Sequence, residues 1–234
     1  MRKKLWRLRQ FNKEDIDEVV RINMSFLPEN YPTSFFMSLH KSYPKLFIVA
    51  ERDPELLSTD REEQNKIARA LDVLRKDGLT SEEYAEVAGI SKDQAEDELL
   101  RLYEISSSLN AGFKFLEREG SQYFLIGDRK IIGYVMCRLE RGRSSFDSIW
   151  VERGHVVSIA VEDAYRGYGI GSELMERAMS EMKKAGADEC VLEVRVSNTP
   201  AINLYKKLGF EISRVINRYY YDGEDAYIMA SKIH

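Results

Sequence analysis

The spacing of apolar residues changes several times along the chain, and each change marks an expected element. Alternation at Leu5, Arg7 and Arg9 predicts a first strand. A helix is predicted to begin after the capping residue Asn12 and to end near the sequence LPENYP, because prolines stop a helix. The residues that should share its buried face are Ile16, Val19, Val20 and Met24.

Strand and helix patterns alternate through the rest of the chain. Strands are predicted over residues 46–52, 131–140, 154–162, 190–196, 210–216 and 226–229. Helices are predicted over residues 33–42 and 170–184, and a further helix from Pro200 to Gly209. The inward face of the 170–184 helix should hold Leu174, Met175, Ala178 and Met182, and Gly186 should cap its C-terminus. This mixture predicts an α/β (α+β) fold.

Residues 53–128 differ from the rest in charge. They contain eighteen Asp or Glu and nine Lys or Arg, a net charge of −9, whereas the remainder carries +5. Helical spacing appears at Ile67, Ala70, Leu71 and Leu74, and two capping boxes follow, Thr80 with Glu83 and Ser91 with Gln94. A hairpin is predicted about Gly120. Three helices and a hairpin favour a winged-helix-like lobe, although a plain helical hairpin fits nearly as well.

Composition narrows the class of protein. A chain of 234 residues with 44% hydrophobic and 32% charged residues can bury one core and a second small unit. No apolar run approaches the about 18 residues of a membrane span, and the basic start lacks the apolar stretch of a signal peptide, so we expect a cytoplasmic protein. Cys137 and Cys190 are expected to be buried free thiols, and the three histidines lack metal-ligand spacing. A net charge of −4 disfavours nucleic acid as a partner.

The turn YRGYGIGS, from Tyr165 to Ser172, carries the clearest chemistry. Its glycines allow a tight turn with exposed N–H groups, and it joins an apolar strand to the start of a helix. The N-terminus of a helix attracts anions, and Arg166 adds a full positive charge. The turn therefore suits a pyrophosphate. It lacks the Lys-Ser or Lys-Thr of a P-loop and the acidic ribose ligand of a dinucleotide fold.

The pattern Arg-x-x-Gly-x-Gly over Arg166, Gly169 and Gly171 resembles the coenzyme A signature of GNAT-superfamily acetyltransferases. Four further segments are similar to protein N-terminal acetyltransferases, above all to the catalytic subunit of N-terminal acetyltransferase A and its archaeal relatives. They are LPENYP, GHVVSIAV, EVRVSNTPAINLYKKLGF and YYYDGEDAY. The resemblance covers about two thirds of the chain, on both sides of the acidic segment.

The resemblance implies a mixed, mostly antiparallel sheet flanked by helices, built from residues 1–52 and 129–234, with residues 53–128 as an inserted lobe. It implies transfer of acetyl from acetyl-CoA to protein N-terminal amines by direct attack in a ternary complex. The implied coenzyme residues are Val157, Ser158, Ile159, Val161, Arg166, Gly167, Tyr168, Gly169, Ile170, Gly171, Ser172, Asn198 and Tyr205. The implied peptide residues are Leu27, Pro28, Glu29, Tyr31, His155, Tyr219 and Tyr220. Glu29 is the candidate base, His155 a second candidate and Tyr205 the candidate acid.

Each of these residues also has a purely structural interpretation. Asn198 could cap the next helix, and Tyr205 could serve core packing alone. His155 could anchor a neighbouring loop, and Glu29 could be a solvated turn residue. The three tyrosines at 219–221 could be ordinary strand residues, although consecutive strand residues face both sides of a sheet.

The chemistry favours an α-amine as acceptor. A free α-amine has a pKa of about 8, so about a tenth is neutral at pH 7, whereas a lysine amine titrates near 10.4 and needs stronger assistance. A lysine or small-amine acetyltransferase is the alternative within enzymes. A DNA-binding regulator with an acetyltransferase-like sensor is the alternative from another class, although its recognition helix would be acidic. The acidic lobe could also dock on the ribosome or on another protein.

Overall fold

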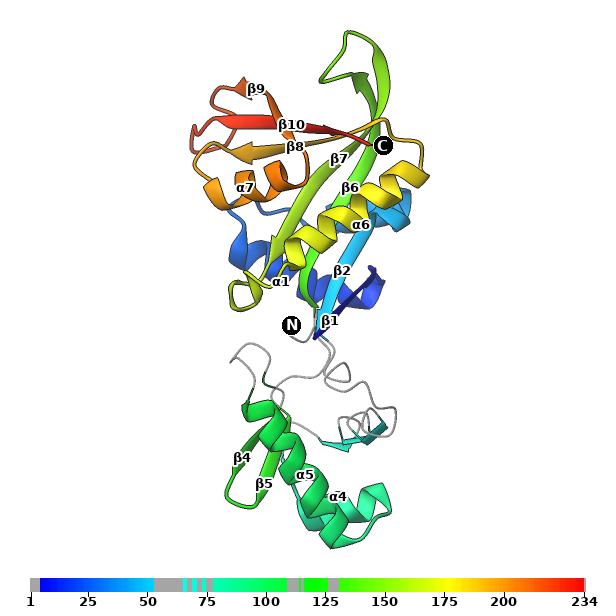
Figure 1. Ribbon diagram of the computed structural model, residues 1–234, viewed down its shortest axis with the longest axis vertical. Coiled ribbons are helices and arrows are strands. Elements are labelled where there is room, and N and C mark those ends of the chain that lie inside the picture. The colour runs from blue at the N-terminus through cyan, green and yellow to red at the C-terminus, as the bar shows by residue number, and fades with distance from the viewer. Residues whose placement is uncertain are drawn as a thin grey trace. The chain divides into compact units, whose positions relative to one another are not determined.

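The computed structural model describes residues 5–52, 65–66, 69–70, 73–74, 78–108, 114, 116–125 and 131–233 (Figure 1). The described chain divides into two compact units. The larger unit holds residues 8–50 and 131–233, and the smaller unit holds the described residues within 5–7 and 51–125. No helix in these described ranges is long and apolar enough to cross a membrane.

The larger sheet has seven strands in the order β1-β2-β6-β7-β8-β10-β9. Their bounds are β1 Trp6–Gln10, β2 Phe47–Arg52, β6 Ile131–Arg143, β7 Trp150–Val161, β8 Glu189–Arg195, β9 Glu211–Ile216 and β10 Ala226–Lys232. β6 pairs antiparallel with β7, and β10 pairs antiparallel with both β8 and β9. The pair β7–β8 is parallel. The mixed, mostly antiparallel sheet expected from the resemblance is therefore confirmed.

Helices cover the sheet on both faces. Their bounds are α1 Ile16–Phe26, α2 Thr33–Ser42, α6 Ile170–Lys184 and α7 Thr199–Lys207. In Figure 1, α6 crosses in front of β6 and β7, whereas α1 and α2 lie behind them. The inward residues predicted for α6 are all fully buried, and Gly186 follows the helix with a φ of 86°. The predicted bounds of α2 and α6 are confirmed.

One prediction for α1 is wrong. Met24 is 64% exposed, and the buried positions of this helix are Val19, Ile22 and Asn23. Asn23 lies four residues after Val19, so helical geometry places it on the inner face. A buried position that is occupied by a polar residue such as Asn23 cannot be recognised from the spacing of apolar residues.

The core between the sheet and α1–α2 is aromatic. Phe11 stacks on Phe47 with ring centroids 4.0 Å apart, and Phe36 and Tyr134 contact the same cluster edge-on. The two cysteines are buried and free, as predicted, and burial raises the pKa of both thiols. Neither thiol is thus suited to act as a nucleophile.

The smaller unit contains α4 Ser81–Ala88 and α5 Lys92–Ser107 against a sheet of order β3-β5-β4. The strands are β3 Leu79–Thr80, β4 Leu116–Glu119 and β5 Gln122–Leu125. Both predicted capping boxes are present, at the N-termini of α4 and α5. The hairpin turns at Gly120, and the third strand favours the winged-helix-like arrangement over a helical hairpin. In the preceding predicted helix, Ile67 and Leu71 lie outside the described residues.

Candidate active site

The central strands β7 and β8 separate partway along their length. They pair from Arg153 with Glu189 to Val156 with Leu192, and beyond this point neither strand has the other as a partner (Figure 1). A register shift between β6 and β7 leaves Val157 as an extra residue at the same place. Such a bulge bends a strand and is common beside active sites. The sheet therefore opens where β7 is bulged.

A pocket of about 420 Å³ occupies this opening. Its walls all come from the larger unit: the two separating strands, the end of α1 and the segment that follows it, α7 with its capping residue, and the connection between β9 and β10. The lining residues are Phe26, Leu27, Pro28, Glu29, Tyr31, Val156, Val157, Ser158, Ile159, Leu192, Glu193, Val194, Arg195, Asn198, Tyr205, Tyr219, Tyr220 and Tyr221. Most of the predicted peptide-slot residues are thus brought together.

The glycine-rich turn follows the end of β7. Gly167 and Gly169 have φ values of 79° and 93°, in the left-handed region that favours glycine, and Gly169 caps the N-terminus of α6. Arg166 lies in the same turn. Its Nε donates to the carbonyl oxygen of Val161 at 3.1 Å, and Nη1 lies 2.8 Å from an oxygen of Asp163. The left-handed glycines and the arginine that the sequence indicated for this turn therefore lie at the N-terminus of α6.

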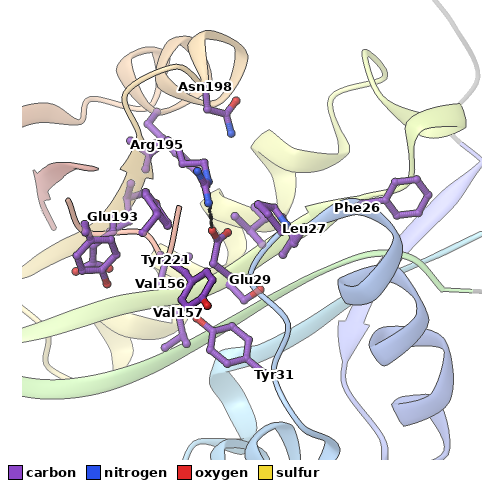
Figure 2. Close-up of a pocket in the computed structure, with 18 residues that line it drawn as sticks. Phe26, Leu27, Glu29, Tyr31, Val156, Val157, Glu193, Arg195, Asn198 and Tyr221 are labelled. Atoms are coloured by element: carbon purple, nitrogen blue, oxygen red, sulfur yellow. Dashed lines mark hydrogen bonds and ion pairs between the residues drawn. The ribbon is translucent and has the colours of Figure 1, made fainter. Parts of the chain in front are cut away.

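Glu29 projects from the α1–α2 segment and meets Arg195 from β8 (Figure 2). Nη2 of Arg195 donates to Glu29 at 2.5 Å, and Nη1 donates to Asp222 and Glu224 at 2.7 Å. The guanidinium carbon lies 4.0 Å from the centre of the Tyr220 ring. Burial opposes the charge of Arg195, but the three carboxylates raise its pKa. Arg195 therefore joins the two loops that flank the pocket.

His155 is placed differently from the prediction. It lies on β7 but is not among the lining residues of the pocket. Its Nε2 lies 2.6 Å from a carboxylate oxygen of Glu193, and its Nδ1 lies 3.3 Å from Glu140 and 3.1 Å from Nη2 of Arg138. Glu193 does line the pocket. His155 therefore reaches the pocket through a carboxylate rather than directly.

The predicted aromatic wall is present. Tyr31, Tyr219 and Tyr220 all line the pocket, and Tyr221 joins them. Burial and the charges of nearby carboxylates raise the pKa of Tyr31, Tyr219 and Tyr220, so all three phenols keep their protons at neutral pH. The three consecutive tyrosines lie between β9 and β10 and not within a strand, which argues against their interpretation as ordinary strand residues.

Asn198 and Tyr205 combine structural and pocket positions. Asn198 accepts a hydrogen bond from the backbone N–H of Ala201 at 3.2 Å, so it caps α7 while it lines the pocket. Tyr205 is 6% exposed and packs beside Phe210, yet it also lines the pocket. Burial raises the pKa of Tyr205, so the phenol is neutral at pH 7 and can donate a hydrogen bond into the pocket.

Arg195 and Glu193 are the two charged pocket residues that the sequence did not predict to have a role. Both lie in the segment EVRVSN, whose alternation indicates a strand. Residues at 193 and 195 are two apart on one strand, which places both side chains on the same face. A carboxylate and a guanidinium on one face of an otherwise apolar strand are the sequence feature that could have indicated these two pocket residues.

Comparisons with known proteins place the chain in a family. Residues 82–210, more than half of the chain, match the acetyltransferase (GNAT) family. An N-alpha-acetyltransferase of Sulfurisphaera tokodaii is 34% identical, over 98% of this chain and 95% of the relative. The chain belongs to the acetyltransferase (GNAT) family. Its similarity to the archaeal enzyme extends over nearly the whole of both chains. This chain is therefore an N-terminal acetyltransferase enzyme.

Solved structures agree on the fold. Ard1 from Thermoplasma volcanium matches with a TM-score of 0.58 and 20% identity, over 99% of both chains. A chain of the NatC complex bound to Gag peptide and CoA matches with a TM-score of 0.61 and 18% identity, over 99% of this chain and 100% of that chain. At these identities the likeness concerns the fold alone.

Proposed function

We propose that the chain transfers the acetyl group of acetyl-CoA to the N-terminal α-amine of proteins, by direct attack inside the pocket between β7 and β8. The observation that carries this proposal is the pocket's two-sided wall. One side leads along β7 to the glycine-rich turn, and the other side is closed by Glu29, the tyrosines and Arg195. A coenzyme and a peptide can therefore enter from different sides and meet.

The coenzyme side is assigned to β7 and the turn that follows it. Residues 157–161 of β7 have no strand partner from β8, so their backbone groups that point away from β6 are available to the pantetheine arm. The N–H groups of Arg166–Ser172 and the N-terminus of α6 would hold the pyrophosphate. N–H groups near the bulge at Val157 would stabilise the oxyanion that forms on the thioester. Tyr205 would protonate the departing thiolate.

The peptide side is assigned to the aromatic wall and the acidic groups. Aromatic faces with hydroxyl groups suit an extended peptide, since they offer apolar surface and hydrogen bonds together. Glu29, the base predicted from sequence, already accepts hydrogen bonds from Arg195. Glu193 instead accepts a hydrogen bond from Nε2 of His155, which orients its carboxylate. We therefore assign Glu29 to hold the incoming ammonium, and Glu193, oriented by His155, to accept its proton.

Direct transfer is favoured over a covalent enzyme intermediate. Cys137 and Cys190 are fully buried with raised thiol pKa values, and neither lines the pocket. The α-amine needs less help to lose its proton than a lysine amine, which titrates more than two pKa units higher. A single carboxylate–imidazole pair is sufficient assistance for such a substrate.

The acidic lobe is proposed to contact a protein or the ribosome, in the cytoplasm. Its candidate DNA-reading helix α5 exposes Asp93, Glu96, Asp97 and Glu104, and these charges would repel phosphates. The regulator alternative therefore has no support from this helix. A basic protein surface fits the charge of the lobe better.

The test is acetylation of synthetic peptides that vary in their first two residues, with acetyl-CoA as donor. A peptide with a blocked N-terminus and one lysine is the control. Mass spectrometry should locate the acetyl group on the α-amine, and the control peptide should react at least about tenfold more slowly. Faster reaction of the lysine peptide would replace the proposed substrate class with lysine side chains.

A further inference from the structure

Asn23, the polar residue on the buried face of α1, is bonded to the pocket segment that follows the helix. Its side chain is 0% exposed. Nδ2 donates to the carbonyl oxygen of Glu29 at 3.3 Å, and Oδ1 accepts from the backbone N–H of Tyr31 at 3.1 Å. These two bonds hold the backbone on both sides of Asn30. The position of the Glu29 carboxylate thus depends on an amide inside the core.

The same amide is connected to the opposite wall of the pocket. Nδ2 of Asn23 also donates to the phenol oxygen of Tyr134 on β6 at 3.0 Å, and that oxygen lies 2.7 Å from Oγ of Ser158 on β7. Tyr134 is 0% exposed and Ser158 7%. Burial raises the pKa of Tyr134 to about 12, so the phenol stays protonated.

The donor and acceptor atoms in this series of hydrogen bonds determine which group donates in each bond. Oδ1 is the acceptor for Tyr31, which identifies the other atom of the amide as the donor toward Tyr134. The phenol oxygen therefore accepts from Asn23, and Oγ of Ser158 is the described neighbour that is left to accept the phenol's own proton. Reversing the amide would leave two facing donors at Tyr31 and two facing acceptors at Glu29. One arrangement is thus strongly favoured over its alternatives.

We propose that Asn23, Tyr134 and Ser158 form a positioning network that sets the peptide wall at a fixed distance from β7. This inference rests on the proposed function, because that function assigns the peptide to one wall of the pocket and acetyl-CoA to the wall formed by β7. Ser158 lies beside the bulge of β7, and Glu29 and Tyr31 lie on the peptide wall. Asn23 and Tyr134 do not line the pocket themselves, so they act through the residues they hold.

Removal of individual hydrogen-bonding groups separates positioning from general stability. Tyr134→Phe deletes the central hydroxyl and keeps the ring that packs on Phe36 and Phe47. Asn23→Ala deletes the amide that holds the segment. Tyr43→Phe is the matched control, because its hydroxyl donates to the carbonyl of Leu139 at 3.1 Å and its ring packs on the same core. It has no bond to the 27–31 segment among those described.

We expect Tyr134→Phe to raise the KM for peptide by about tenfold, which corresponds to one buried hydrogen bond, and Asn23→Ala to raise it further. The KM for acetyl-CoA should change less than twofold in both, and Tyr43→Phe should change neither constant. A fall in kcat with unchanged peptide KM would overturn the inference, as would equal effects of Tyr134→Phe and Tyr43→Phe.

Amide hydrogen exchange gives a readout that does not depend on activity. Exchange at Tyr31 should become at least about tenfold faster in Tyr134→Phe and Asn23→Ala, and remain as in the wild type in Tyr43→Phe. Unchanged exchange in both network variants would overturn the inference even if the wild type acetylates α-amines. A wild type that fails to acetylate α-amines would contradict the proposed function, while the exchange result would still decide the network.

Discussion

A carboxylate oxygen of Glu193 lies 2.6 Å from Nε2 of His155, so the carboxylate on the pocket wall accepts a hydrogen bond from the imidazole behind it. The two residues come from the parallel strands β8 and β7, and Glu193 directly follows the last residue of β8 that pairs with β7. His155 therefore fixes the orientation of the carboxylate that faces the pocket.

Glu193→Gln should lower kcat by about 100-fold, because general-base assistance is typically of that size, while acetyl-CoA affinity changes little. His155→Gln should act in the same direction, and the double variant should lose less than the product of the two single effects. Steady-state kinetics with a reactive peptide measure all three.

Glu29→Gln is the comparison variant. It should raise the peptide KM with a smaller effect on kcat, because it removes a charge that holds the ammonium. If Glu29→Gln instead abolishes the acidic limb of the pH–rate profile and Glu193→Gln is near normal, the base is Glu29, as expected from sequence.

Gly169→Asp should severely weaken acetyl-CoA binding in calorimetry. A carboxylate would face the phosphates, and the φ of 93° would strain any side chain. Gly169→Asn carries the same strain without the charge and is the matched control. The Asp variant should bind at least about tenfold more weakly than the Asn variant. Equal affinities would mean that the phosphates bind elsewhere.

Glu140 should contribute a pH-dependent part of the stability. Its partial burial opposes the charge, but His155, Arg153 and Arg138 together lower its pKa. A carboxyl group whose pKa is lower in the folded state stabilises the fold above its unfolded value of about 4.3, and this contribution is lost as the pH falls through the folded value. Glu140→Gln should therefore lower the Tm by a few degrees at pH 7 and by less at pH 4.

Thermal melts of Glu140→Gln at the two pH values need a surface control. Glu152→Gln on the same hairpin is suitable, because Glu152 is exposed and has no described ion pair. Its Tm should stay close to that of the wild type at both values. A loss in Glu140→Gln that grows toward pH 4 would contradict the assigned direction.

Removal of residues 53–128, with a short turn joining the flanking strands, should leave a folded core that binds acetyl-CoA. The reason is that the pocket is built entirely from the larger unit. Circular dichroism and calorimetry on the shortened chain measure folding and binding. A shortened chain that stays unfolded with acetyl-CoA present would show that the proposed domain boundary is wrong.

The elements with strong apolar periodicity could be predicted from the sequence. The bounds of α2 and α6 agree with the prediction, and the capping boxes of the smaller unit are where their side chains indicated. Local hydrogen bonding and one-sided burial are properties of neighbouring residues, so a single stretch of sequence carries them.

The connections between distant segments could not be predicted in this way. Asn23 meets Tyr134, 111 positions later, and Arg195 meets Glu29, 166 positions earlier. Neither contact produces a local sequence pattern, because the two residues of each pair lie in separate stretches of the chain. The resemblance implies that Glu29 and His155 both line the peptide slot. In the structure Glu29 lines the pocket, whereas Glu193 lies between His155 and the pocket.

The separation of β7 and β8 also governs how the two halves of the large sheet hold together. Within the sheet, β8, β10 and β9 are paired with the other strands through four parallel residue pairs, while residues 157–161 and 193–195 line the opening between β7 and β8. A coenzyme and a peptide that bond to both strand edges would bridge the opening between β7 and β8. Bound ligands should therefore raise the unfolding temperature and make the two halves melt as one.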